Sequence, residues 1–130
     1  MIGIVIVAHG GLAREYLAAI EHVLGAQTMI HAISIGVQED RDRKRAEIEA
    51  AANAVDDGTG VIIVTDMFGG SPSNLSLPAV EHRDRRILYG ANLPMLIKLV
   101  KSRHMPLADA VSDSLRAGRK YLDCFDAFGN

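Results

Sequence analysis

The sequence predicts an α/β domain built on a parallel sheet, because β-branched runs and helical segments alternate along it. Short runs rich in isoleucine and valine are separated by longer segments whose apolar residues recur with a helical period, the order typical of right-handed crossovers. Of the 130 residues, 48% are hydrophobic and 23% are charged, so the chain can bury a core. We therefore expect one domain over residues 1–130, with a three-layer, doubly wound sheet of four parallel strands.

Four runs are expected to form these strands. The run Arg86–Tyr89 has the weakest pattern, whereas the other three are clearly β-branched. Those three are Ile2–Val7, Ile30–Ile35 and Val61–Thr65. The first and the last of the three are almost wholly apolar, which indicates strands covered by helices on both faces.

Five segments are expected to be helical. Leu12–Leu24 has an apolar stripe and ends before Gly25. Asp40 can cap a helix that runs to about Val55, and Ser71-Pro72 opens another helix with a proline in its first turn. The remaining two segments are Leu93–Ser102 and Leu107–Ala117.

Charge and cysteine content exclude several classes of function. The formal net charge is -2, and the basic run Arg41–Arg45 is interleaved with acidic residues, so we interpret it as a solvated helix face and expect no binding to nucleic acid. Cys124 is the single cysteine, so no intrachain disulfide can form. The apolar N-terminus has no basic leader or cleavage site, and we expect a cytoplasmic protein.

Two polar side chains, His9 and Asp66, follow the ends of predicted strands. Ligands bind outside the carboxyl ends of parallel strands, so the two side chains meet at one edge if their strands are neighbours. A carboxylate that accepts the N–H of one imidazole nitrogen fixes the tautomer and leaves the other nitrogen nucleophilic. We predict that the pair is catalytic, although a histidine after a strand is by itself more often structural.

The loop after the second of these strands is predicted to bind an anion. Gly69 and Gly70 allow the backbone to approach a ligand closely. The hydroxyl of Ser71 and free N–H groups of the turn at Ser73 and Asn74 can donate to phosphate oxygens. A helix N-terminus contributes only about 0.3–2 kcal/mol to anion binding, so several donors must converge.

Hydrolase and metal chemistry fit the residues less well. A Ser71–His9–Asp66 triad has the right residue types, but Pro72 follows the serine and lacks the N–H that an oxyanion hole requires. The histidines show no metal-ligand spacing, and no nucleotide-binding glycine motif occurs. We expect neither a metal nor a cofactor. Four histidines are interpreted as structural or surface residues: His22, His31, His82 and His104.

Three blocks of the sequence resemble the mannose-type IIA component of the bacterial phosphoenolpyruvate-dependent phosphotransferase system. They are IVIVAHGGLAREYLAAIEHVLG, VIIVTDMFGGSPSN and ILYGANLPMLIKLV, in the family's order and spacing. The resemblance implies that His9 accepts a phosphoryl group on Nε2 from the phosphohistidine of HPr. It implies that Asp66 orients this histidine and that Ser71 lies on the phosphate side. The acceptor would be a IIB component or a regulatory target.

The same resemblance implies a homodimer. In the family a fifth, antiparallel strand is exchanged between subunits, and Arg119–Phe125 occupies its place. Exchange would pair an apolar strand that a free tail would leave exposed. The residues alone equally allow a helix end that packs back on its own subunit.

Two departures from the family pattern bear on the role. Met67 and Phe68 stand where sugar-transporting members have Thr-Trp, and we predict that these two residues contact a partner. Some members continue into a IIB domain, whereas this sequence ends at Asn130. Sugar transport, with peripheral association with a membrane permease, and regulation therefore both stay open. The alternatives are the phosphotransfer subunit of a dihydroxyacetone kinase and a non-catalytic interaction module.

Overall fold

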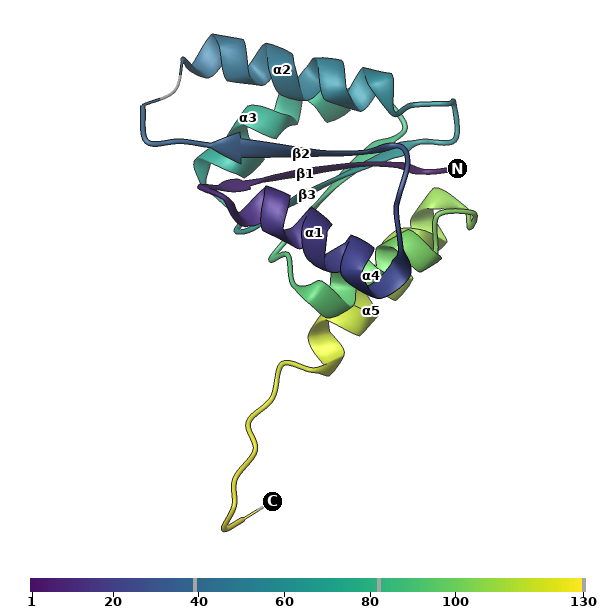
Figure 1. Ribbon diagram of the computed structural model, residues 1–130. Helices are drawn as coiled ribbons and strands as arrows, with labels where there is room; N and C mark the ends of the chain where they lie inside the picture. Colours follow the sequence, from purple (N-terminus) through teal and green to yellow (C-terminus); the bar gives the residue numbers. More distant parts are fainter. Residues whose placement is uncertain (39, 82, 130) are drawn as a thin grey trace.

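The computed structural model describes residues 1–38, 40–81 and 83–129, and its helices alternate with strands as predicted (Figure 1). In chain order the elements are β1 (Gly3–His9), α1 (Leu12–Leu24), β2 (Ile30–Ile35), α2 (Arg41–Ala54), β3 (Val61–Thr65), α3 (Ser71–Val80), β4 (Arg85–Tyr89), α4 (Leu93–Lys101) and α5 (Leu107–Lys120).

The strands form one parallel sheet in the order β2-β1-β3-β4. The central strands β1 and β3 are buried along almost their whole length, which explains why their sequences are nearly all apolar. The outer strands β2 and β4 are each paired on one side within the described residues. The prediction of four parallel strands is confirmed.

Helices cover both faces of the sheet. In Figure 1, α2 and α3 lie above the strands, and α1, α4 and α5 lie below them. Alternating residues of β1 divide the core: Ile4 and Ile6 pack toward the lower helices, and Val5 and Val7 pack toward the upper ones. The three-layer arrangement is therefore the one that the sequence predicts.

Local signals set most of the element ends. The carboxylate of Asp40 accepts the backbone N–H groups of Asp42 and Arg43 and so caps α2. β1 continues beyond the expected Val7 to His9, because it pairs with β2 as far as Ile35. The strand therefore carries the histidine at its very end.

Helix α5 is longer than predicted, and its extension corrects the expected bounds of the fifth strand. The helix was expected to end at Ala117, but the next residue, Gly118, lies inside α5 and packs against α4. A Cβ there would lie 3.0 Å from Cβ of Met95, and the Gly118 carbonyl accepts a hydrogen bond from the amide of Asn92. Arg119 and Lys120 are therefore helical and not part of a strand.

The segment after α5 forms no strand with the described residues of its own chain. It leaves the domain as an extended tail, drawn in yellow in Figure 1. Its large apolar side chains are exposed, with Leu122 at 73%, Phe125 at 85% and Phe128 at 101%. Leu122 lines a groove between β4 and α5 of its own chain, but the described residues beyond it do not pack back on their own subunit, which was the alternative to exchange.

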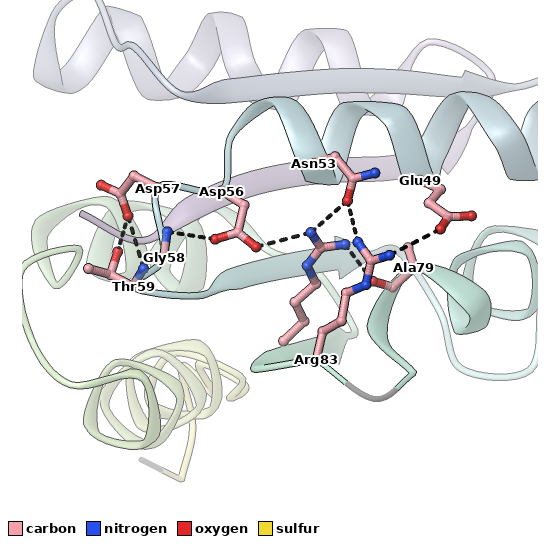
Figure 2. Close-up of polar contacts among 9 residues, drawn as sticks. Glu49, Asn53, Asp56, Asp57, Gly58, Thr59, Ala79 and Arg83 are labelled. Atoms are coloured by element: carbon pink, nitrogen blue, oxygen red, sulfur yellow. Dashed lines mark hydrogen bonds and ion pairs between the residues drawn. The ribbon is translucent and has the colours of Figure 1, made fainter.

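A buried arginine links β4 to two helices at the edge of the sheet opposite His9. Arg85, at the start of β4, is 5% exposed and donates to the Ala79 carbonyl, to Asn53 and to Asp56. Figure 2 shows the side-chain oxygen Oδ1 of Asn53 accepting hydrogen bonds from two guanidinium groups, one of which belongs to Arg83. These contacts join the C-terminal end of α2 to α3 and β4.

Candidate functional site

His9 and Asp66 lie side by side at the carboxyl edge of the sheet. Their strands are neighbours, since Val7 of β1 is paired with Thr65 of β3. The Oδ2 atom of Asp66 accepts the backbone N–H of His9 at 2.9 Å and lies 2.7 Å from Nδ1 of the His9 ring. The predicted juxtaposition is present in the structure.

The environment of Asp66 keeps its carboxylate ionised. Burial alone would raise the pKa of Asp66, but hydrogen bonds from the His9 amide and ring outweigh it and hold the pKa below its usual value. The side chain is 12% exposed, and Oδ1 is buried without a hydrogen-bond partner among the described residues. The ionised carboxylate is therefore directed through Oδ2 at the histidine.

This contact fixes the tautomer of His9. With Nδ1–H donating to Oδ2, the second ring nitrogen, Nε2, carries the free lone pair. The side chain of His9 is 47% exposed. The arrangement is that of an oriented, accessible imidazole nucleophile.

The loop between β3 and α3 is fastened by its own side chains, which corrects part of the predicted anion site. The Ser73 hydroxyl accepts the N–H of Gly69 and donates to the Gly70 carbonyl. The N–H of Asn74 donates to the same carbonyl and opens the helical hydrogen-bond pattern, so it is not free for a ligand. Ser73 and Asn74 therefore shape the loop through these groups.

Gly70 lies against the His9 ring, whereas Ser71 makes no hydrogen bond to it. The hydroxyl of Ser71 makes no hydrogen bond to any described residue, His9 included, so the contact that a hydrolytic triad requires is not present. A Cβ on Gly70 would lie 3.2 Å from Cε1 of His9. The loop thus lies against Cε1, the ring atom between Nδ1 and Nε2.

An exposed apolar patch adjoins the loop, and sequence reasoning found only two of its three residues. Met67 is 55% exposed and Phe68 is 72% exposed. The ring of Phe68 packs on that of Tyr89, with centroids 4.7 Å apart. Tyr89 is the last residue of β4, the strand next to β3. Its place at a strand end beside the loop could have predicted that it belongs to the patch.

The described residues contain no cluster of histidine, cysteine or acidic side chains suited to a metal ion. His22, His31 and His104 are exposed, as surface residues are. His82, for which the same interpretation was made, lies outside the described residues. Within residues 1–38, 40–81 and 83–129, no helix combines the length and hydropathy of a membrane-spanning segment.

Comparison with known proteins identifies the family. The EIIA-man family, described as "PTS system fructose IIA component", matches residues 3–116. The chain belongs to this family. The family is therefore that of IIA components of the phosphotransferase system (PTS).

Relatives of the IIA chain cover it to different extents. The "PTS system mannose-specific EIIAB component" of Escherichia coli K12 is 30% identical over 103 residues, which make up 78% of this chain and 32% of that protein. The chain thus spans about a third of that relative. The "PTS system sorbose-specific EIIA component" of Lacticaseibacillus casei is 27% identical over 124 residues, 91% of this chain and 86% of that protein.

Solved structures agree with the IIA assignment. The crystal structure of phosphotransferase system component EIIA from Streptococcus agalactiae superposes on this chain with a TM-score of 0.86 and 29% sequence identity. The match covers 96% of this chain and 98% of that one. The fold of four parallel strands flanked by helices is therefore the fold of the IIA family.

Proposed function

We propose that the chain is a phosphocarrier in which His9 accepts a phosphoryl group from phospho-HPr. The observation that carries this proposal is the 2.7 Å contact between Nδ1 of His9 and Oδ2 of Asp66. It supports a fixed tautomer, and the exposure of the ring supports access of a protein donor to Nε2.

In the proposed reaction, the lone pair of Nε2 attacks the phosphorus atom of the HPr phosphohistidine. The new P–Nε2 bond forms as the P–N bond of the donor breaks, and the HPr imidazole leaves with that electron pair. His9 keeps its proton on Nδ1, so the phosphorylated ring is cationic and remains paired with Asp66. We propose no metal or cofactor, because the donor is already a reactive phosphoramidate and the protein supplies positioning.

The phosphoryl oxygens are proposed to lie against the start of α3. The Ser71 hydroxyl is available as a donor, and the N–H of Ser73 belongs to the first turn of the helix, where N–H groups lack helical partners. Gly69, with a φ of +82°, and Gly70 let the loop approach the ring closely. Asn74 then contributes by holding this loop through its contacts to Gly69 and Gly70.

The patch formed by Met67, Phe68 and Tyr89 is proposed as the surface on which a phosphorylation partner docks. Exposed aromatic side chains beside a reactive group are typical of the centre of a protein interface. The three residues adjoin the loop that reaches His9. A partner seated here would bring its own phosphorylated side chain to Nε2.

The C-terminal segment is proposed to form a fifth, antiparallel strand on the free edge of β4 in a second copy, which gives a homodimer. That edge borders a groove of about 390 Å³ between β4 and α5, lined in part by Ile87, Leu88 and Leu115. The exposed Leu122 and Phe125 of the tail supply matching apolar side chains. Exchange would cover both the free edge and the tail.

The next acceptor is proposed to be a IIB component or a regulatory target, in the cytoplasm, with peripheral association with a membrane permease in the transport case. Incubation of the protein with phosphoenolpyruvate, enzyme I and HPr tests the proposal. We expect a mass increase of one phosphoryl group that depends on HPr. Binding of HPr without any mass increase would instead indicate a non-catalytic interaction module. Transfer onward to dihydroxyacetone kinase, but not to a IIB component, would indicate the kinase subunit.

A further inference from the structure

A second hollow surface lies between α4 and α5, and it shares no lining residue with the His9 site. We call it the α4–α5 groove; its volume is about 540 Å³. The two helices lie side by side below the sheet in Figure 1. Residues of the groove recur at helical spacing on both walls, such as Leu93 and Ile97 on α4 and Asp113 and Ala117 on α5.

The groove combines an apolar floor with a cationic rim. Leu93 is 37% exposed, and Pro94, Ile97 and Ala117 are partly exposed beside it. Each wall carries two cations, which are Lys98 and Lys101 on α4 and Arg116 and Lys120 on α5. Asp113 is the one carboxylate in the lining.

Most of these cations lack an internal partner. Arg116 pairs with Asp113 at 3.4 Å. Among the described residues no carboxylate lies within ion-pair distance of Lys98, Lys101 or Lys120, although Lys120 also lies over the ring of Tyr121. The whole chain has a formal net charge of -2, so the groove reverses the sign of the protein locally.

Two classes of ligand fit this lining poorly. Sugar phosphates and nucleotides are recognised through several hydroxyl and amide side chains as well as cations. Among the described lining residues, only Tyr121 carries a hydroxyl and none carries an amide side chain. A membrane surface is flat, whereas this site is concave.

We propose that the α4–α5 groove binds an acidic amphipathic helix of a partner protein. A third helix packs naturally into the furrow between two others, with its apolar side chains on the floor. Carboxylates that flank such an apolar stripe would face the lysines of both walls. The lining runs along α4, which has 9 residues, and along α5 only from Asp113 onward, so α4 sets the length of helix that the groove can hold. This binding does not depend on the phosphocarrier role of His9.

The test uses the full chain and two synthetic peptides of about 14 residues, long enough to lie along α4. The first peptide has a helical leucine stripe flanked on both sides by glutamates, and the second has the same composition with the leucines scattered. We expect the first to bind with a Kd below about 1 mM, and amide NMR shifts to concentrate on α4 and α5. High salt should weaken this binding.

Charge reversal supplies the matched variants. Lys98→Glu with Lys101→Glu should weaken binding about tenfold at low salt, and Leu93→Ser should weaken it without changing the salt dependence. Lys98→Gln with Lys101→Gln serves the same purpose if the reversal lowers stability, because both lysines lie in the last turn of α4. Arg41→Glu with Arg43→Glu makes the same charge change on α2, on the opposite face of the sheet, and should leave binding unchanged.

Several results would overturn the proposal. They are equal binding of the two peptides, no binding of the striped peptide up to about 1 mM, and NMR shifts at Met67, Phe68 and Tyr89 in place of α4 and α5. The protein could instead sediment with phosphatidylglycerol vesicles and bind neither peptide. If Lys98→Glu with Lys101→Glu abolished that sedimentation, the groove would be assigned to a membrane. Loss of HPr-dependent phosphorylation in that variant would assign it to HPr docking.

Discussion

Gly70 lies against the His9 ring so closely that a Cβ on it would come within 3.2 Å of Cε1. The backbone of Gly70 has a φ of -82° and a ψ of 174°, which alanine adopts without strain. Glycine is therefore needed here because a side chain would collide with the ring, and not because the backbone conformation requires it. Any substitution must move the ring, the loop or both.

Gly70→Ala should slow phosphorylation of His9 about 3- to 10-fold, because a shift of a few tenths of an ångström misaligns the nucleophile. Rates of transfer from phospho-HPr measure the effect. Gly11→Ala is the matched control, since a Cβ at Gly11 meets nothing within 4 Å and its φ is -88°. Equal rates for the two variants would show that the contact with the ring has no bearing on transfer.

Asp66→Asn should slow phosphorylation by about one to two orders of magnitude. The amide keeps the shape of the side chain but removes the charge that stabilises the cationic phosphorylated ring. Because the pKa of Asp66 lies below its usual value, the wild-type carboxylate is ionised throughout the neutral range. Asp42→Asn on the exposed face of α2 is the control. A wild-type rate for Asp66→Asn would mean that the pair does not act in transfer.

The site followed from the sequence because parallel strands end at a common edge. One apolar run leads to His9 and another ends before Asp66, so their juxtaposition was predicted on the condition that the two strands are neighbours. The strands are paired, and Nδ1 of His9 lies 2.7 Å from Oδ2 of Asp66. The capping of α2 by Asp40 and the start of α3 at Ser71 were equally local signals. Each depended on neighbours within a few residues.

Other features depend on packing and could not be predicted locally. Gly118 has the identity of a helix stop, but its contact with Met95 keeps it inside α5. The N–H of Asn74 was predicted to be free for an anion, but it donates to the Gly70 carbonyl. Burial of Arg85 requires acceptors from α2 and α3, which are distant in sequence. Tyr89 meets Phe68 only through the pairing of β3 with β4.

The two loop serines should respond differently to truncation. Ser71→Ala removes one neutral hydrogen-bond donor to the phosphoryl group. We expect the binding free energy of that group to become less favourable by about 0.5–1.5 kcal/mol, with unchanged free energy of unfolding. Ser73→Ala leaves the Gly69 N–H without its partner and removes one of two donors to the Gly70 carbonyl, and we expect the free energy of unfolding to fall by about 1–3 kcal/mol. Urea denaturation and transfer kinetics on both variants separate the effects. A larger stability loss in Ser71→Ala than in Ser73→Ala would contradict the assignment.

Removal of residues 122–130 should abolish the proposed homodimer. The deletion keeps all of α5 and takes away the apolar strand that would cover the β4 edge of the second copy. We expect a monomer of low solubility, because the edge and its groove are left open. Light scattering on the deleted and full chains measures the change, with Leu122→Asp as a milder variant. A deletion protein that stays soluble and dimeric would show that another surface forms the dimer.

The phosphocarrier proposal is tested most directly by locating the phosphoryl group. NMR of the protein with ¹⁵N-labelled histidine, after incubation with phosphoenolpyruvate, enzyme I and HPr, distinguishes the two nitrogens of each imidazole ring. We expect phosphorus on Nε2 of His9, a proton on Nδ1 and no phosphorylation of His9→Ala. Phosphorus on Nδ1, or undiminished labelling of His9→Ala, would contradict the proposed role of the His9–Asp66 pair.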